Sequence, residues 1–185
     1  MDPGFRRGDK RRVVRPIERF MPSRVDAVGG NSAVNLPTMF IQATCVVVEG
    51  CGLLLRGPPG SGKSEVALQL IDGGARLVAD DGVELRRQGE RLFAHLPAGA
   101  PESVRGRIEL RGLGILPAPS VAEASLDLVI DLVPVDALER LPEPMTVELL
   151  GVALPLLRLS AAEPSAAAKV RLAVRAGPRS IIPPP

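Results

Sequence analysis

The chain has 185 residues, of which 45% are hydrophobic and 24% are charged, and its formal net charge is +2. This length suits one ordinary domain with its own core. The apolar runs of the chain are shorter than the roughly 18 residues that a membrane span needs. So small a net charge gives no support for nucleic-acid binding. Two cysteines and one histidine are too few for a Cys/His zinc site or a disulfide framework, and we expect a cytoplasmic protein. Without Trp or Tyr, the composition also disfavours an aromatic platform for single-stranded nucleic acid.

Residues 1–38 show no sustained period and are rich in Arg, Gly and Pro. Such a segment buries too little apolar surface to offset the entropy of ordering it. We therefore expect a disordered or spurious extension, which an upstream start codon would explain, with Met39 opening the domain. A targeting peptide or a nucleic-acid-binding arm is the alternative for so basic a start. The expected domain covers residues 39–177, and residues 178–185 form an irregular tail.

From Phe40 the sequence predicts short strands and two helices. The apolar runs at 40–50 and 51–57 are joined by Gly-Cys-Gly and predict a hairpin. Residues 63–74 place apolar side chains at helical spacing and close on Gly-Gly, which predicts a helix. A short strand at 75–79 ends in two acids, and the runs 83–87 and 91–96 predict a second hairpin.

The second half of the domain is predicted to be mostly strands. Residues 106–116 form a strand followed by a glycine-punctuated turn, 126–134 a buried strand, and 145–151 with 152–159 a strand pair whose second member Pro155 interrupts. A helix starts at about Ser165. Because strands outnumber helices and hairpins are frequent, the sequence predicts an α/β domain with a mixed sheet rather than a purely parallel one.

The stretch GPPGSGKS between the first hairpin and the first helix matches the complete P-loop pattern GxxxxGK[ST]. Its glycines permit positive φ angles that turn backbone N–H groups inward, and the helix N-terminus adds partial positive charge. Lys63 can reach the β- and γ-phosphates, and the Ser64 hydroxyl can bind Mg²⁺. An ordinary glycine-rich turn is the alternative, but it has no need of the Lys-Ser pair. The predicted phosphate-binding residues are Gly57, Pro58, Pro59, Gly60, Ser61, Gly62, Lys63 and Ser64.

A P-loop is shared by GTPases, transport ATPases and small-molecule kinases, so other residues must identify the reaction. Asp80 and Asp81 follow a predicted strand, and because successive side chains point to opposite faces, one can face the phosphates as metal contact or base while the other braces the loop. A solvated turn is the alternative.

Two residues of a later strand are the other candidates. Glu109 and Arg111 share one strand face, where a metal ligand and a phosphate clamp can converge, or else they form a solvent-facing edge. His95 has no motif around it, so proton transfer falls to a carboxylate.

Together GPPGSGKSE, RLVADDG and RGRIELRGLGIL resemble the catalytic domain of the bacterial HPr kinase/phosphorylase family, from about Ile41 to Arg140. The resemblance implies a P-loop fold with a mixed sheet, shared with phosphoenolpyruvate carboxykinases. It also implies a cytoplasmic serine kinase that uses ATP and Mg²⁺, acts on an HPr-like phosphocarrier protein, and forms a homo-oligomer, a hexamer by family analogy. A role in regulating the phosphotransferase system follows from the same resemblance.

Residue roles follow from this resemblance. Lys63 and the loop hold the phosphates, while Ser64 and Glu109 serve the Mg²⁺. Asp81 takes the proton of the acceptor serine, and Arg140 steadies charge on the moving phosphoryl group. In the family's reverse reaction inorganic phosphate attacks the phosphoserine and pyrophosphate leaves.

The sequence departs from the family pattern in three places. We expect that residues 1–38 do not replace the family's separate N-terminal domain. Gln42 stands where the family has a catalytic histidine, and a basic loop tied to the reverse reaction is not recognisable, leaving Arg158 as one candidate. Since glutamine does not change charge near neutral pH, the kinase direction is favoured. An ATP-binding regulatory module without phosphotransfer, or a P-loop kinase of a small metabolite, are the alternatives.

Overall fold

The computed structural model describes residues 36–178, which form two helices and eleven strands. The helices are α1, Lys63–Asp72, and α2, Ala166–Ala176. The strands are β1 Thr38–Ile41, β2 Thr44–Val48, β3 Cys51–Arg56, β4 Arg76–Ala79, β5 Val83–Gln88, β6 Arg91–His95, β7 Arg107–Leu110, β8 Gly114–Pro117, β9 Glu123–Leu132, β10 Met145–Leu149 and β11 Val152–Leu159.

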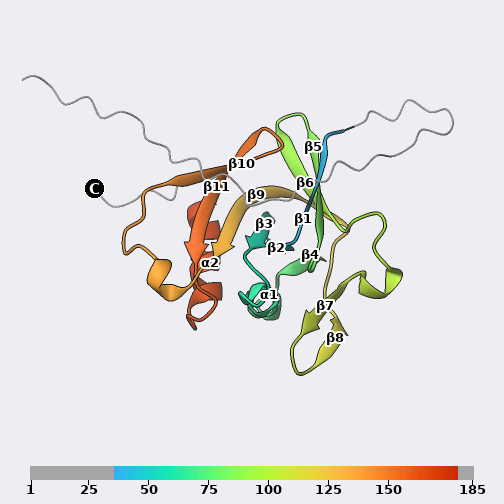
Figure 1. Ribbon diagram of the computed structural model, residues 1–185, viewed down its shortest axis with the longest axis horizontal. Helices are drawn as coiled ribbons and strands as arrows, with labels where there is room; N and C mark the ends of the chain where they lie inside the picture. The colour runs from blue at the N-terminus through green and yellow to red at the C-terminus, as the bar shows by residue number, and fades with distance from the viewer. Residues whose placement is uncertain (1–35, 179–185) are drawn as a thin grey trace, which may run out of the picture.

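Nine strands form one mixed sheet, which confirms the predicted α/β class. Its order is β1-β5-β6-β9-β3-β2-β4, with β11 paired to β9 and β10 to β11. The contacts of β9 with β3 and β11 are parallel, whereas its contact with β6 is antiparallel. β7 and β8 form a separate two-stranded ribbon, which projects beside α1 at the lower right of Figure 1.

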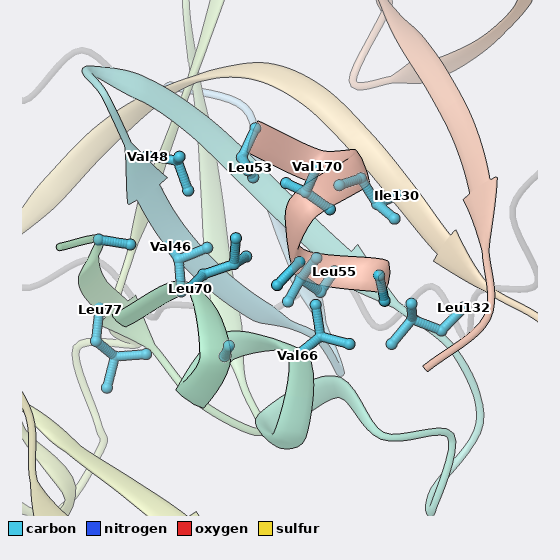
Figure 2. Close-up of a cluster of buried hydrophobic side chains, with 14 of the residues drawn as sticks. Val46, Val48, Leu53, Leu55, Val66, Leu70, Leu77, Ile130, Leu132 and Val170 are labelled. Atoms are coloured by element: carbon cyan, nitrogen blue, oxygen red, sulfur yellow. The ribbon is translucent and has the colours of Figure 1, made fainter. Parts of the chain in front are cut away.

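Two apolar clusters lie on the two faces of this sheet. On one face α1 and α2 cover β2, β3 and β9. The side chains labelled in Figure 2 show that these five elements pack against one another. On the other face the sheet curls onto itself, so that β5, β6 and β10 enclose the second cluster. Because successive residues of a strand face opposite sides, β3 contributes Leu53 and Leu55 to the first cluster and Leu54 to the second.

Most predicted elements are confirmed, but three expectations were wrong in detail. Phe40 and Ile41 do not belong to the first hairpin, because they form β1, which pairs with β5 instead. The glycine-punctuated turn after β7 leads into a further strand, β8. Pro155 does not interrupt β11. It lies opposite Thr146 of β10, just before the residues of β11 that pair with β9. The pairing of β11 with β9 therefore loses no hydrogen bond to the missing N–H of proline.

The predicted domain start at Met39 is close to the start of β1 at Thr38. Expectations for residues 1–35 and 179–185 lie outside the described residues. In the part of the chain that is described, no helix is long and apolar enough to cross a membrane.

Candidate active site

The P-loop connects the carboxyl end of β3 to the first turn of α1, as the sequence predicted. Gly60 and Gly62 adopt φ angles of 82° and 90°, in the left-handed region that glycine occupies without steric cost. Gly62 is also the residue that caps the start of α1. The loop therefore has the backbone conformation and the helix N-terminus that favour an anion.

Lys63 is the first residue of α1 and only 6% exposed. Its Nζ donates to the carbonyl oxygens of Gly57 and Pro58, at 3.1 and 3.3 Å. A buried ammonium needs such acceptors, and these two hold it across the loop. The side chain is thus positioned to meet an anion bound by the loop amides.

Asp80 joins three parts of the site. Its Oδ1 accepts a hydrogen bond from Oγ1 of Thr44 at 2.7 Å, and its Oδ2 accepts one from the backbone N–H of Glu109 at 3.1 Å. The Ser64 hydroxyl lies 3.2 and 3.3 Å from its two oxygens. Asp80 therefore ties the beginning of β2, the beginning of α1 and the ribbon strand β7 to one carboxylate.

Asp81 points elsewhere, because its backbone is in the left-handed region with φ of 59°. Asp is among the few residues that tolerate this conformation. The two adjacent acids consequently have different surroundings, but strand alternation is not the cause, because both lie beyond the end of β4. Asp81 is exposed and lines the pocket beside the P-loop.

The pocket beside the loop has a volume of about 300 Å³. The predicted base Asp81, the predicted ligand Glu109 and the possible clamp Arg111 all line it, together with Gln42. A Cβ added at Gly60 would lie 3.6 Å from Nη2 of Arg111, so this guanidinium reaches over the loop. The remaining lining residues are Pro59, Gly60, Gly62, Lys63, Ser64, Glu65 and Leu110.

Three other candidates lie away from this pocket. Arg140 follows β9 in an exposed segment and is not among the lining residues, so its role stays a prediction. Arg158 lies on β11 opposite Asp131, also outside the lining. Burial, and after it the charge of Arg86, lowers the pKa of His95, whose Nδ1 is 3.5 Å from Glu123.

The segment after β11 packs on the P-loop. Ala161 lies two residues beyond the end of β11, and a Cβ added at Gly62 would lie 2.5 Å from the Cβ of Ala161. The only charged residue between Ser160 and Ser165 is Glu163, whose Oε1 pairs with Lys169 at 2.7 Å. The residues of this segment that follow β11 therefore include no arginine, and the candidate Arg158 lies before them in β11.

Sequence reasoning left Asp80 without a definite role and missed Thr44 altogether. The order of the sheet explains why. β2 lies between β3 and β4, and Thr44 at the start of β2 hydrogen-bonds to Asp80. A polar residue at the start of the otherwise apolar strand β2 was the one available signal.

The donor set fits a magnesium nucleotide. Oxygen atoms from Ser64, Asp80 and Glu109 are the ligand type that Mg²⁺ prefers, and the loop backbone with Lys63 supplies the donors that phosphate oxygens need. Ser64 lies in α1, Asp80 follows β4 and Glu109 lies in β7, and both the Ser64 hydroxyl and the backbone N–H of Glu109 donate to the Asp80 carboxylate.

A P-loop at one end of a mixed sheet, with carboxylates around it, defines the general class as an α/β P-loop domain. The model of the HPr serine kinase C-terminal domain matches residues 36–174. The chain therefore belongs to this family, as the resemblance implied.

Named relatives and a solved structure agree with this assignment. HPr kinase/phosphorylase of Caldanaerobacter subterraneus subsp. tengcongensis is 46% identical over 103 residues, which are 52% of this chain and 33% of the relative. The enzyme of that name from Alkaliphilus metalliredigens is 41% identical over 103 residues, 52% of this chain and 32% of the relative. The matched part of the chain thus spans about a third of these relatives' length. The HPr(Ser) kinase/phosphatase structure from Coxiella burnetii matches with a TM-score of 0.65 and 27% identity, covering 74% of this chain and 88% of that one.

Proposed function

We propose that this chain is a serine protein kinase that uses ATP and Mg²⁺ to phosphorylate an HPr-like phosphocarrier protein. The observation that carries the proposal is the pocket that Asp81 and Glu109 line together with the P-loop residues Gly60, Gly62, Lys63 and Ser64. By family analogy we expect it to act in the cytoplasm as a homo-oligomer, with a hexamer as the expected state.

The loop backbone and Lys63 would hold the β- and γ-phosphates of ATP, while Ser64, Asp80 and Glu109 would hold the Mg²⁺. When bound, ATP supplies the phosphoryl group and Mg²⁺ offsets the negative charge of the phosphate oxygens. Asp81 orients the acceptor serine hydroxyl and accepts its proton. The new bond joins the serine oxygen to the γ-phosphorus, the bond to the β-phosphate oxygen breaks, and ADP leaves.

Arg111 is better placed than Arg140 to stabilise charge on the transferred group. It lines the pocket and approaches Gly60, whereas Arg140 does not line it. A guanidinium can bind two phosphate oxygens at once. We therefore propose Arg111 for this role in the described arrangement.

The kinase direction is better supported than phosphorolysis. Gln42 lines the pocket at the position compared with the family histidine, and an amide does not change its charge near neutral pH. The segment that contacts Gly62 offers Glu163 rather than an arginine for an incoming phosphate. We expect slow or absent release of pyrophosphate from a phosphoserine protein.

The test is transfer of radiolabel from γ-labelled ATP to a purified HPr homologue. Wild type should label the acceptor, and Asp81→Asn should reduce the rate at least 100-fold, as expected for loss of a general base. Asp136→Asn, which changes an exposed acid outside the pocket, is the matched control and should retain the rate. No labelling by wild type, or full labelling by Asp81→Asn, contradicts the proposal.

A regulatory module that binds ATP without transferring phosphate is the second candidate, and Gln42 in the pocket favours it. It predicts nucleotide-dependent thermal stabilisation with no turnover on any phosphocarrier. The labelling assay separates the two candidates, because only the kinase modifies its partner.

A further inference from the structure

Thr44 is a buried polar residue next to the site. It is the first residue of β2 and its side chain is 0% exposed. Its Oγ1 donates to Oδ1 of Asp80 at 2.7 Å, a shorter distance than those from Asp80 to Ser64 or to the Glu109 amide. Hydrogen bonds to a charged acceptor are both shorter and stronger than neutral ones.

Packing alone does not explain a threonine here. By the alternation along β2, Thr44 faces the same side as Val46 and Val48, which pack against α1. Valine has nearly the same shape, so it would fill the space as well. A buried hydroxyl costs free energy unless it is hydrogen-bonded, and the partner of this one is Asp80.

The bond from Thr44 holds one oxygen of Asp80, and the amide of Glu109 holds the other. The carboxylate is thereby fixed with both oxygens within reach of the Ser64 hydroxyl. A hydroxyl that donates its proton to a carboxylate keeps its lone pairs free for a cation. Fixing the carboxylate therefore also fixes the direction in which Ser64 presents those lone pairs.

We propose that Thr44 is a positioning residue for the magnesium site and acts through Asp80 and Ser64. The proposal rests on the proposed function only in that the site binds a magnesium nucleotide, and it does not require any acceptor protein. Residues that orient metal ligands typically affect metal affinity about 10- to 100-fold.

The first test is calorimetric binding of ADP to the full chain with and without Mg²⁺. Thr44→Val should weaken the Mg²⁺-dependent part of binding about 10- to 100-fold and leave Mg²⁺-free ADP binding unchanged, because the loop and Lys63 are untouched. Thr44→Ser should retain the Mg²⁺ dependence of wild type. Thr146→Val, on β10 outside the pocket, makes the same atomic change and should bind as wild type.

Equal Mg²⁺ dependence in wild type, Thr44→Ser and Thr44→Val would overturn the proposal. So would loss of Mg²⁺-free ADP binding in Thr44→Val, because it would indicate a damaged loop. If Thr44→Val does not fold, the same binding measurement compares Thr44→Ser with Thr44→Ala, since these two differ only in the hydroxyl. Weaker Mg²⁺-dependent binding in Thr44→Ala supports the proposal, and equal binding overturns it.

A nucleotide-free crystal structure of Thr44→Val separates this inference from the proposed function. Asp80 turned away from Ser64 supports the positioning role even if no kinase activity is found. Asp80 still within hydrogen-bond distance of Ser64 overturns that role even if the kinase activity is confirmed.

Discussion

Ala161, which follows β11, packs directly against Gly62 of the P-loop. A side chain at position 62 would place its Cβ 2.5 Å from that of Ala161, closer than two carbon atoms can approach. The contact joins the chain before α2 to the residue that caps the start of α1, and it leads to the first prediction.

Gly62→Ala should destabilise the fold for two reasons, a backbone in the left-handed region and a clash with Ala161. The backbone alone costs about 1–2 kcal/mol, and the clash adds to it. Gly74→Ala is the matched control, since Gly74 has φ of 95° but no atom within 4 Å of its added Cβ. Urea unfolding should show a larger loss of unfolding free energy for Gly62→Ala. Equal losses of unfolding free energy in the two variants would mean that Ala161 moves away from the added Cβ at little cost.

Lys63→Ala should abolish thermal stabilisation by Mg-ADP. At 100 times the dissociation constant a ligand stabilises a protein by about 2.7 kcal/mol, and this gain should vanish with the ammonium that spans the loop. Differential scanning fluorimetry across an ADP series measures it. Lys169→Ala, which removes an α2 lysine paired with Glu163, should keep the ligand-dependent shift. A wild-type, ADP-dependent rise in melting temperature in Lys63→Ala would contradict the assignment of Lys63 as a phosphate contact.

Arg171→Ala should destabilise the end of α1. Nη2 of Arg171 donates to the backbone carbonyls of Gln69 and Leu70, at 2.6 and 3.4 Å. These carbonyls belong to the last turn of α1, where intrahelical partners are lacking and a cation is favourable. The expected loss of unfolding free energy is about 1–2 kcal/mol. Arg175→Ala, on the same helix but in an exposed pair with Glu49, should have a much smaller effect, and the reverse order would contradict the capping role.

The two cysteines should make stability depend on pH above about pH 9. Burial raises the pKa of the Cys45 thiol above its ordinary range, and burial together with Asp127 raises the pKa of Cys51 to about 12. The unfolded chain loses these protons near pH 9.0 while the folded chain keeps them, so unfolding becomes easier as pH rises from about 9 toward 12.

Urea unfolding of Cys51→Ala should show a weaker pH dependence than wild type over that range. Thiol labelling of the native protein at pH 7.5 should be slow for Cys45, which is buried, and slow for the half-buried Cys51, whose raised pKa keeps the thiol protonated. Rapid labelling of Cys45 in the native state would contradict its burial.

The local elements of the site could be predicted from the sequence because their signals are local. The P-loop pattern between Gly57 and Ser64 specifies the turn, and the apolar spacing with the Gly-Gly stop specifies α1. The sequence predicted different roles for Asp80 and Asp81 from alternation along a strand, but both lie beyond the end of β4, and the sequence did not show which acid takes which place. The positive φ at Asp81, which decides this, depends on tertiary contacts.

What could not be predicted was pairing between distant segments. The sequence contains no signal that β2 lies between β3 and β4, and without that order Thr44 has no visible connection to Asp80. The same holds for the contact of Ala161 with Gly62, whose residues are about a hundred positions apart. Arg140 was assigned by resemblance alone, and no contact of the described chain brings it to the pocket.

The arrangement of β9 has a consequence for how the domain opens. One edge of this strand bonds to β3, and the other bonds first to β6 and then to β11. Separating β3 or β11 from β9 exposes apolar residues of both clusters. Partial opening therefore costs nearly as much free energy as complete unfolding. The amide protons of Leu128–Ile130 should therefore exchange with solvent only when the whole domain unfolds, and the nucleotide site would be lost in that same cooperative event.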